Sequence, residues 1–151
     1  MKKEKNKHIG FTCGAMDLLH AGHILMLKEA SEQCDYLIVG LHTDPTIDRP
    51  EKNSPIQSLQ ERKIQLEGCK YVNEIREYDT EADLKKMLSE FRDAFGQNNF
   101  VRIIGADWKG KNYTGHDLGI QTIFNSRNHN YSSSELRQRI FEKETLAKKP
   151  L

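Results

Sequence analysis

The alternation of short apolar runs with amphipathic segments is the feature that most constrains the fold of this 151-residue chain. Strand-like apolar composition occupies residues 8–12, 36–42, 71–78, 100–105 and 119–124. Helical apolar spacing occupies residues 18–34, 58–69, 81–96 and 133–144. Strands that alternate with helices form parallel sheets with right-handed crossovers, which place helices on both faces. We expect a single α/β domain over residues 1–151, frayed at 1–7 and 145–151.

Two elements can be described in more detail. In the second helical segment, apolar spacing predicts that Leu59, Ile64 and Leu66 point inward. The third strand is expected to centre on residues 72–75, where its apolar content is highest. Both expectations rest on local pattern alone.

Charge and cysteine content exclude several classes of protein. The 23 Lys and Arg nearly cancel the 22 Asp and Glu, so no global field favours a nucleic acid or an anionic membrane as a partner. Cys13, Cys34 and Cys69 show no C-x-x-C spacing, which indicates reduced thiols and a cytoplasmic location. The longest apolar run, "YLIVGL", is far shorter than the ~20 residues of a membrane helix.

The carboxyl ends of the strands are where ligands bind in sheets of this kind. Four stretches follow those ends here, and they hold most of the polar residues that the fold does not explain. They are residues 13–23, 42–55, 105–115 and 125–134. The second carries three of the four prolines, which indicates an irregular, mobile loop.

The stretch "GAMDLLHAGH", residues 14–23, carries the strongest chemical signal. Gly14 would allow unusual backbone angles and close approach of a ligand, and Gly22 leaves room above the first turn of the next helix. Free amides at a helix start bind anions. His20 and His23, three residues apart, share a face of that turn and can both donate to one phosphate group. A capping role for one ring and a surface role for the other is the alternative.

Several other chemistries lack their motifs in this chain. There is no H-E-x-x-H for a zinc protease and no P-C-x-x-C for a zinc deaminase. Neither a Walker P-loop nor a G-x-G-x-x-G is present, which weakens kinase-like and dinucleotide-binding interpretations.

These residues resemble the cytidylyltransferase family of nucleotidyltransferases, whose motif reads G-T-F-D-x-x-H-x-G-H, and its glycerol-3-phosphate cytidylyltransferases in particular. Besides "GAMDLLHAGH", the resemblance rests on "DYLIVGLHTD", "QERK", "IGADWKGK" and "SRNHNYSSSELR". It implies a Rossmann-like sheet in the order 3-2-1-4-5 and a homodimeric assembly, as is common in the family. It also implies direct attack of an alcohol phosphate on the α-phosphorus of CTP, with pyrophosphate leaving and Mg²⁺ bridging phosphates. The acceptor it favours is sn-glycerol 3-phosphate, which would give CDP-glycerol.

The resemblance also assigns roles to individual residues. The catalytic group would be His20, His23, Lys52 and Arg127. Nucleotide binding would involve Cys13, Gly14, Ala15, Asp17, Gly22, Arg127, Tyr131, Ser132, Ser133 and Ser134. Substrate binding would involve Arg62, Asp107 and Trp108. No residue is assigned as a dedicated metal ligand.

Departures from the family pattern leave alternatives open. Ala15 and Met16 replace the usual Thr-Phe, and Asn130 stands where the family has glycine. A second hypothesis is an adenylyltransferase that uses ATP and a sugar phosphate or similar acceptor. A third, motivated by Ala15 and by the single lysine of the loop, Lys52, is a nucleotide-binding module without turnover. A purely structural or partner-binding protein would leave both histidines and Arg127 without a role.

Overall fold

A five-stranded, all-parallel sheet forms the centre of the molecule in a computed structural model that describes residues 7–146. The strands are β1 (Ile9–Gly14), β2 (Tyr36–His42), β3 (Glu74–Tyr78), β4 (Phe100–Gly105) and β5 (Gln121–Asn125). The helices are α1 (Ala21–Glu32), α2 (Leu59–Glu67), α3 (Glu81–Phe95) and α4 (Ser133–Leu146), with a short 3-10 turn at Ala106–Trp108. The order β3-β2-β1-β4-β5 confirms the Rossmann-like α/β fold.

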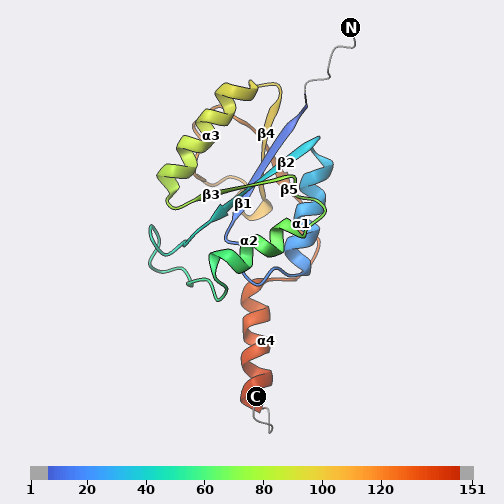
Figure 1. The fold of residues 1–151 in the computed structure, drawn as a ribbon, viewed down its shortest axis with the longest axis vertical. Helices are drawn as coiled ribbons and strands as arrows, with labels where there is room; N and C mark the ends of the chain where they lie inside the picture. Colours follow the sequence, from blue (N-terminus) through green and yellow to red (C-terminus); the bar gives the residue numbers. More distant parts are fainter. Residues whose placement is uncertain (1–6, 147–151) are drawn as a thin grey trace.

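Helices cover both faces of the sheet (Figure 1). On one face, Leu27 of α1 and Leu66 of α2 pack against apolar side chains of β2 and β4. On the other face, Leu84 and Leu88 of α3 pack against Phe11 and neighbouring side chains. Because apolar side chains alternate between two buried faces, the inner strands read as continuous apolar runs.

Two local expectations were wrong. Ile64 is 58% exposed, and the buried position on α2 that it was expected to share with Leu66 belongs to Arg62 instead. Strand β3 spans Glu74–Tyr78, so its centre lies at Arg76, beyond the expected centre over residues 72–75. It is an edge strand whose Arg76 and Glu77 face solvent. An edge strand with one polar face has little apolar content by which to locate it.

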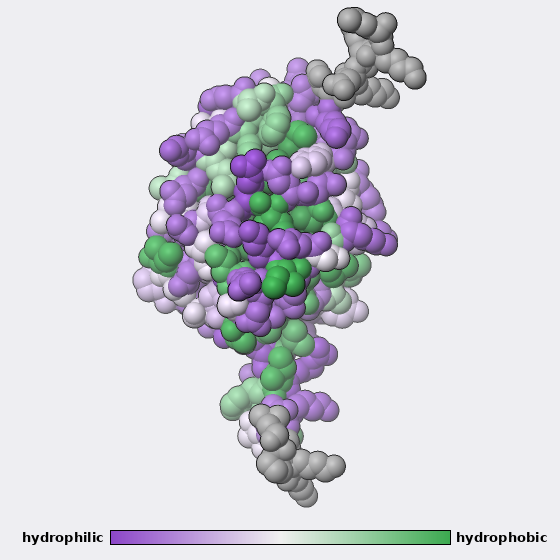
Figure 2. Space-filling model, in the orientation of Figure 1, coloured by the Kyte–Doolittle hydropathy of each residue, from purple (hydrophilic) through white to green (hydrophobic). Residues whose placement is uncertain are grey.

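Helix α4 stands away from the rest of the molecule, as a stem below the sheet in Figure 1. None of its residues is buried, and Ile140 and Phe141 are 46% and 65% exposed. Figure 2 shows apolar side chains on this stem. Residues 145 and 146 lie within α4, whereas residues 1–6 and 147–151 lie outside the described part of the chain, so the expected fraying stays a prediction. Within residues 7–146, no helix is long and apolar enough to cross a membrane.

Candidate active site

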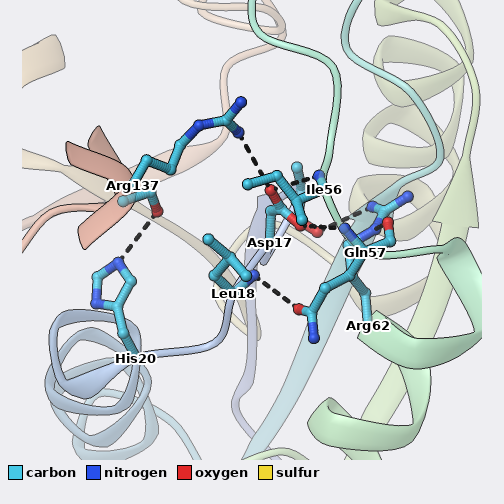
Figure 3. Close-up of polar contacts among 9 residues, drawn as sticks. Asp17, Leu18, His20, Ile56, Gln57, Arg62 and Arg137 are labelled. Atoms are coloured by element: carbon cyan, nitrogen blue, oxygen red, sulfur yellow. Dashed lines mark hydrogen bonds and ion pairs between the residues drawn. The ribbon is translucent and has the colours of Figure 1, made fainter. Parts of the chain in front are cut away.

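The turn between β1 and α1 is held by bonds from a loop distant in sequence (Figure 3). The Asp17 carboxylate accepts from the amides of Ile56 and Gln57, each at 2.9 Å. The Gln57 side-chain oxygen accepts from the Leu18 amide at 2.7 Å. These bonds stabilise left-handed backbone angles at Met16 and Leu18, with φ of 52° and 50°. The unusual angles expected of Gly14 fall on these two residues instead.

His20 and His23 form a reciprocal cap at the start of α1. His20 Nδ1 accepts from the Gly22 amide at 3.0 Å, and His23 Nδ1 accepts from the His20 amide at 3.1 Å. A ring nitrogen that accepts a hydrogen bond carries no proton, so in the neutral rings both protons are on Nε2. The cap therefore turns each imidazole into a donor with a fixed tautomer. The ring centroids lie 4.0 Å apart.

Both imidazoles have lowered pKa values. Burial, followed by the proximity of His20, lowers the pKa of His23 from 6.5 to about 4. Burial is also the main cause for His20, and nearby His129 and Arg127 lower its pKa further. Both rings are therefore neutral at pH 7 and act as hydrogen-bond donors. They are neither positively charged groups nor general bases.

An open cleft of about 260 Å³ lies beside this pair, at the carboxyl edge of the sheet. His20 Nε2 lies 3.1 Å from Ser133 Oγ, so the start of α4 meets the start of α1 here. Gly22 is required by this packing, because a Cβ atom there would lie 2.8 Å from the His20 ring and 3.1 Å from His129. The lining residues include His20, Gly22, His23, Met26, Gly105, Asp107, Asn125, Arg127, His129, Tyr131 and Ser133.

Two further hollows adjoin the cleft, and Met26 lines all three. One, of about 310 Å³, lies over β1 and β4 and is lined by residues that include Arg49, Glu81, Arg102, Trp108 and Tyr113. The other, of about 340 Å³, is lined by residues that include Cys13, Gly14, Ala15, Asp17, His23, Ser133, Ser134 and Arg137. Space for two ligands therefore surrounds the histidine pair.

Comparison with known proteins agrees with this geometry. The sequence profile described as cytidylyltransferase-like matches residues 11–139. The chain belongs to the cytidylyltransferase-like family. This confirms the family-level resemblance seen in the sequence.

Relatives of this cytidylyltransferase-like chain include longer proteins. It is 43% identical over 75 residues to the probable ethanolamine-phosphate cytidylyltransferase of Encephalitozoon cuniculi, covering 50% of this chain and 23% of that protein. It is 33% identical over 119 residues to the bifunctional protein HldE of Campylobacter concisus, covering 78% and 24% of the two chains. The chain thus spans about a quarter of the length of these curated relatives.

A solved structure shares the fold over nearly its whole length. The lipopolysaccharide core biosynthesis protein of Thermoplasma volcanium GSS1 matches with a TM-score of 0.65 and 25% identity, covering 82% of this chain and 99% of that one. That solved chain is therefore similar in size to the matched part of this cytidylyltransferase-like chain.

Most residues of the cytidylyltransferase-like pattern meet around the three hollows. Arg127 pairs with Asp107 at 2.8 Å at the mouth of the cleft. Trp108 lies in the second hollow with Arg49 over its ring, 5.8 Å from the centroid. The nucleotide-binding residues predicted from the sequence line the cleft or the third hollow.

Arg62 does not reach these hollows. Its side chain is 2% exposed and donates four hydrogen bonds to main-chain carbonyls. The acceptors are those of Gln57, Ala15, His42 and Thr43, at 3.2, 3.0, 2.7 and 2.6 Å. Arg62 therefore ties both ends of the loop to the β1–α1 turn, and the geometry does not bring it to a substrate.

Lys52 also lines none of the three hollows. It is exposed in the loop that Arg62 holds at its two ends. Asn53 and Pro55, close to it in sequence, line the third hollow, so the loop is adjacent to the site. A role for Lys52 at the phosphates stays a prediction that requires loop movement.

The structure adds residues that sequence reasoning missed. Arg137 of α4 lines the third hollow and lies 3.6 Å from the Asp17 carboxylate (Figure 3). Its spacing of four residues from Ser133, on one helix face, is a signal that could have revealed it. Met26 and Asn125 belong to no sequence motif. Their place at the site can be recognised only from the fold, which brings β5 next to α1.

Mg²⁺ is the metal that the family resemblance implies. Within residues 7–146, no three His, Cys, Asp or Glu side chains gather closely enough to hold an ion. Mg²⁺ commonly binds through substrate phosphates and water with few protein ligands. The donors present are consistent with an ion that arrives with a triphosphate.

Proposed function

We propose that this protein transfers CMP from CTP to a small phosphorylated alcohol, with sn-glycerol 3-phosphate as the first choice. CDP-glycerol and pyrophosphate would be the products. The observation that supports this most directly is the pair of neutral imidazoles that line the cleft with their protons on Nε2, the one on His20 next to Ser133 Oγ. Family membership supports the same class of chemistry.

The reaction is a direct displacement at phosphorus. A phosphate oxygen of the acceptor attacks the α-phosphorus of CTP, a new P–O–P bond forms, and the bond to pyrophosphate breaks. The attacking oxygen carries no proton at neutral pH, so the step needs no general base. Neutral histidines with low pKa values fit that requirement, because their role is to donate hydrogen bonds to the phosphoryl oxygens as charge builds on them.

Further groups of this chain would hold the triphosphate. The hydroxyls of Ser133 and Ser134, in the first turn of α4, lie around the same space. Arg137 and Arg127 supply positive charge on either side of it. Mg²⁺ bound to the triphosphate would neutralise part of its charge, and Lys52 would reach the phosphates when the loop closes.

The acceptor is assigned to the hollow of about 310 Å³ next to the cleft. Two arginines, Arg49 and Arg102, can bind its phosphate. The Glu81 carboxylate, which accepts from Thr114 Oγ1 at 2.7 Å, can bind hydroxyl groups. Guanidinium groups for phosphate together with oxygen acceptors for hydroxyls favour a polyol phosphate.

The experiment that tests this function follows pyrophosphate release in the presence of Mg²⁺. CTP and ATP are each combined with glycerol 3-phosphate, ethanolamine phosphate and a sugar phosphate. We expect release with CTP and glycerol 3-phosphate, with CDP-glycerol detected by phosphorus NMR. Pyrophosphate release with ATP but not with CTP would mean that the protein is an adenylyltransferase. Tight binding of a triphosphate without turnover for any acceptor would make the protein a binding module.

A further inference from the structure

Asn125, the last residue of β5, holds an unpartnered polar atom at the wall of the cleft. Its side chain is 3% exposed, and its Oδ1 atom is buried without any hydrogen-bond partner. Within residues 7–146 it is the only buried side-chain nitrogen or oxygen in that situation. Because such atoms are rare in native proteins, this one requires an explanation.

The orientation of the Asn125 amide follows from its neighbour on α1. Nδ2 lies 3.4 Å from the main-chain carbonyl of Met26, to which it donates. Exchanging the nitrogen and the oxygen would place two acceptors against each other. The unpartnered group is therefore the acceptor Oδ1, and a ligand that satisfies it must supply a donor.

Other polar groups of the same wall already have partners. The Ser126 amide and hydroxyl both bind the Glu29 carboxylate, at 2.8 and 3.0 Å. Asp107 pairs with Arg127. Among the buried side-chain acceptors of this wall, Asn125 Oδ1 is thus the one without a partner in residues 7–146.

The cleft also offers a surface for a flat ring. His129 and Tyr131 stack on each other with centroids 5.3 Å apart and an angle of 25° between the rings, and both line the cleft. Aromatic rings of this kind favour stacking of a nucleobase. Asn125 lines the same cleft as these two rings and as His20 and Ser133, which would bind the phosphates.

We propose that Asn125 Oδ1 accepts a hydrogen bond from the exocyclic amine of the bound base. This rests on the proposed function, and it names the class of nucleotide: amino bases such as cytosine or adenine are selected over the oxo bases uracil or hypoxanthine. An oxo base would place its carbonyl oxygen against Oδ1, acceptor to acceptor. Asn125 thereby determines specificity without taking part in the chemical step.

The test compares CTP with UTP, and ATP with ITP, in the wild-type protein and in Asn125→Leu. Leucine has a similar shape and no acceptor. We expect kcat/KM for the amino nucleotide to fall about 10- to 100-fold in the variant, while that for the oxo nucleotide does not fall. Ser126→Ala, in the same wall, is the matched control and should leave the ratio of the two nucleotides unchanged.

Calorimetric binding of the same four nucleotides keeps the inference testable without turnover. Amino-base preference in binding that is lost in Asn125→Leu supports it, even if no acceptor is ever used and the proposed function fails. A ratio that Asn125→Leu leaves unchanged overturns it. The proposal is also overturned if Asn125→Leu weakens the binding of CTP and UTP equally but does not weaken the binding of 2′-deoxy-CTP. In that case Asn125 Oδ1 would bind the ribose hydroxyl and not the base.

Thermal unfolding of the free protein gives an independent readout. Replacing a buried, unpartnered carbonyl with leucine should leave the melting temperature equal or raise it. A melting temperature that falls while the nucleotide ratio stays the same would make Asn125 a structural residue and overturn the proposal.

Discussion

At the scale of single residues, one imidazole performs two tasks. Nδ1 of His20 caps helix α1, while its Nε2–H faces the cleft and Ser133. An alanine substitution would remove both functions together, so the loss of activity could be attributed to either. A shorter residue that caps well but places no donor at the position of Nε2 separates them.

His20→Asn is that substitution. Asparagine is among the best N-cap residues, so the free energy of unfolding should change by less than about 1 kcal/mol. The donor to the phosphoryl oxygens is lost, and kcat should fall about 100-fold or more. Steady-state kinetics and urea unfolding measure the two effects. Full activity in a stably folded His20→Asn protein would contradict the proposed role.

Sequence reasoning identified the residues of this site that belong to motifs and missed those that do not. His20, His23 and Ser133 stand in recognisable patterns at the ends of strands or the start of a helix. The importance of Asn125 depends on a carbonyl of Met26, 99 positions away in sequence. No local pattern contains that relation.

At the scale of elements, the start of α1 depends on the protonation of its cap. The pKa of His23 is about 4 in the folded protein, against 6.5 as the ordinary value. Between these values the unfolded chain binds more protons than the folded one. The free energy of unfolding therefore falls as the pH falls from 6.5 toward 4, and it is fully retained above 6.5.

We expect a loss of about 2–3 kcal/mol from this group between pH 7 and pH 4, measured by urea unfolding across that range. His23→Gln is the matched control, because glutamine at this position completes a capping box and does not titrate. Its unfolding free energy should show a shallower pH dependence. Parallel profiles for the two proteins would refute the assignment.

The loop after β2 is a second element whose geometry depends on one side chain. Arg62 binds four carbonyls at the loop ends and at the β1–α1 turn. Pattern analysis placed Ile64 inward because of its apolar spacing with Leu59 and Leu66. Burial of Arg62 requires carbonyls from three separate segments, which a helical periodicity cannot indicate.

Arg62→Met should lower the free energy of unfolding by about 2–4 kcal/mol, because buried carbonyls lose their donors. Lys63→Ala is the control on the same helix. It removes an exposed pair with Glu77 at 3.4 Å, and the expected change is below about 1 kcal/mol. If Arg62→Met instead raised KM for the phosphorylated alcohol and left the free energy of unfolding unchanged, Arg62 would be a substrate-binding residue.

At the scale of the whole molecule, the sheet and α4 contribute differently. The order of strands and the layers of helices followed from alternation and family resemblance, since parallel sheets allow few topologies. Helix α4 buries none of its residues, yet its first turn carries Ser133 and Ser134. The homodimer suggested by the resemblance stays a prediction.

Ending the chain after Gln138 separates these contributions. The melting temperature should change by only a few degrees, because α4 adds no residue to the core. A helix of two turns or less is unstable alone, so the first turn should fray and KM for the nucleotide should rise several-fold. A large loss of thermal stability, or an unchanged KM, would contradict this division.

The histidine cap has a consequence for evolution. The same two imidazoles cap α1 and line the cleft. A descendant in which both histidines were replaced would therefore lose the helix cap together with the activity. Selection for a folded protein would then favour Ser, Thr, Asp or Asn at position 20 and Glu or Gln at position 23. Such a pair would mark an inactive paralogue by sequence alone.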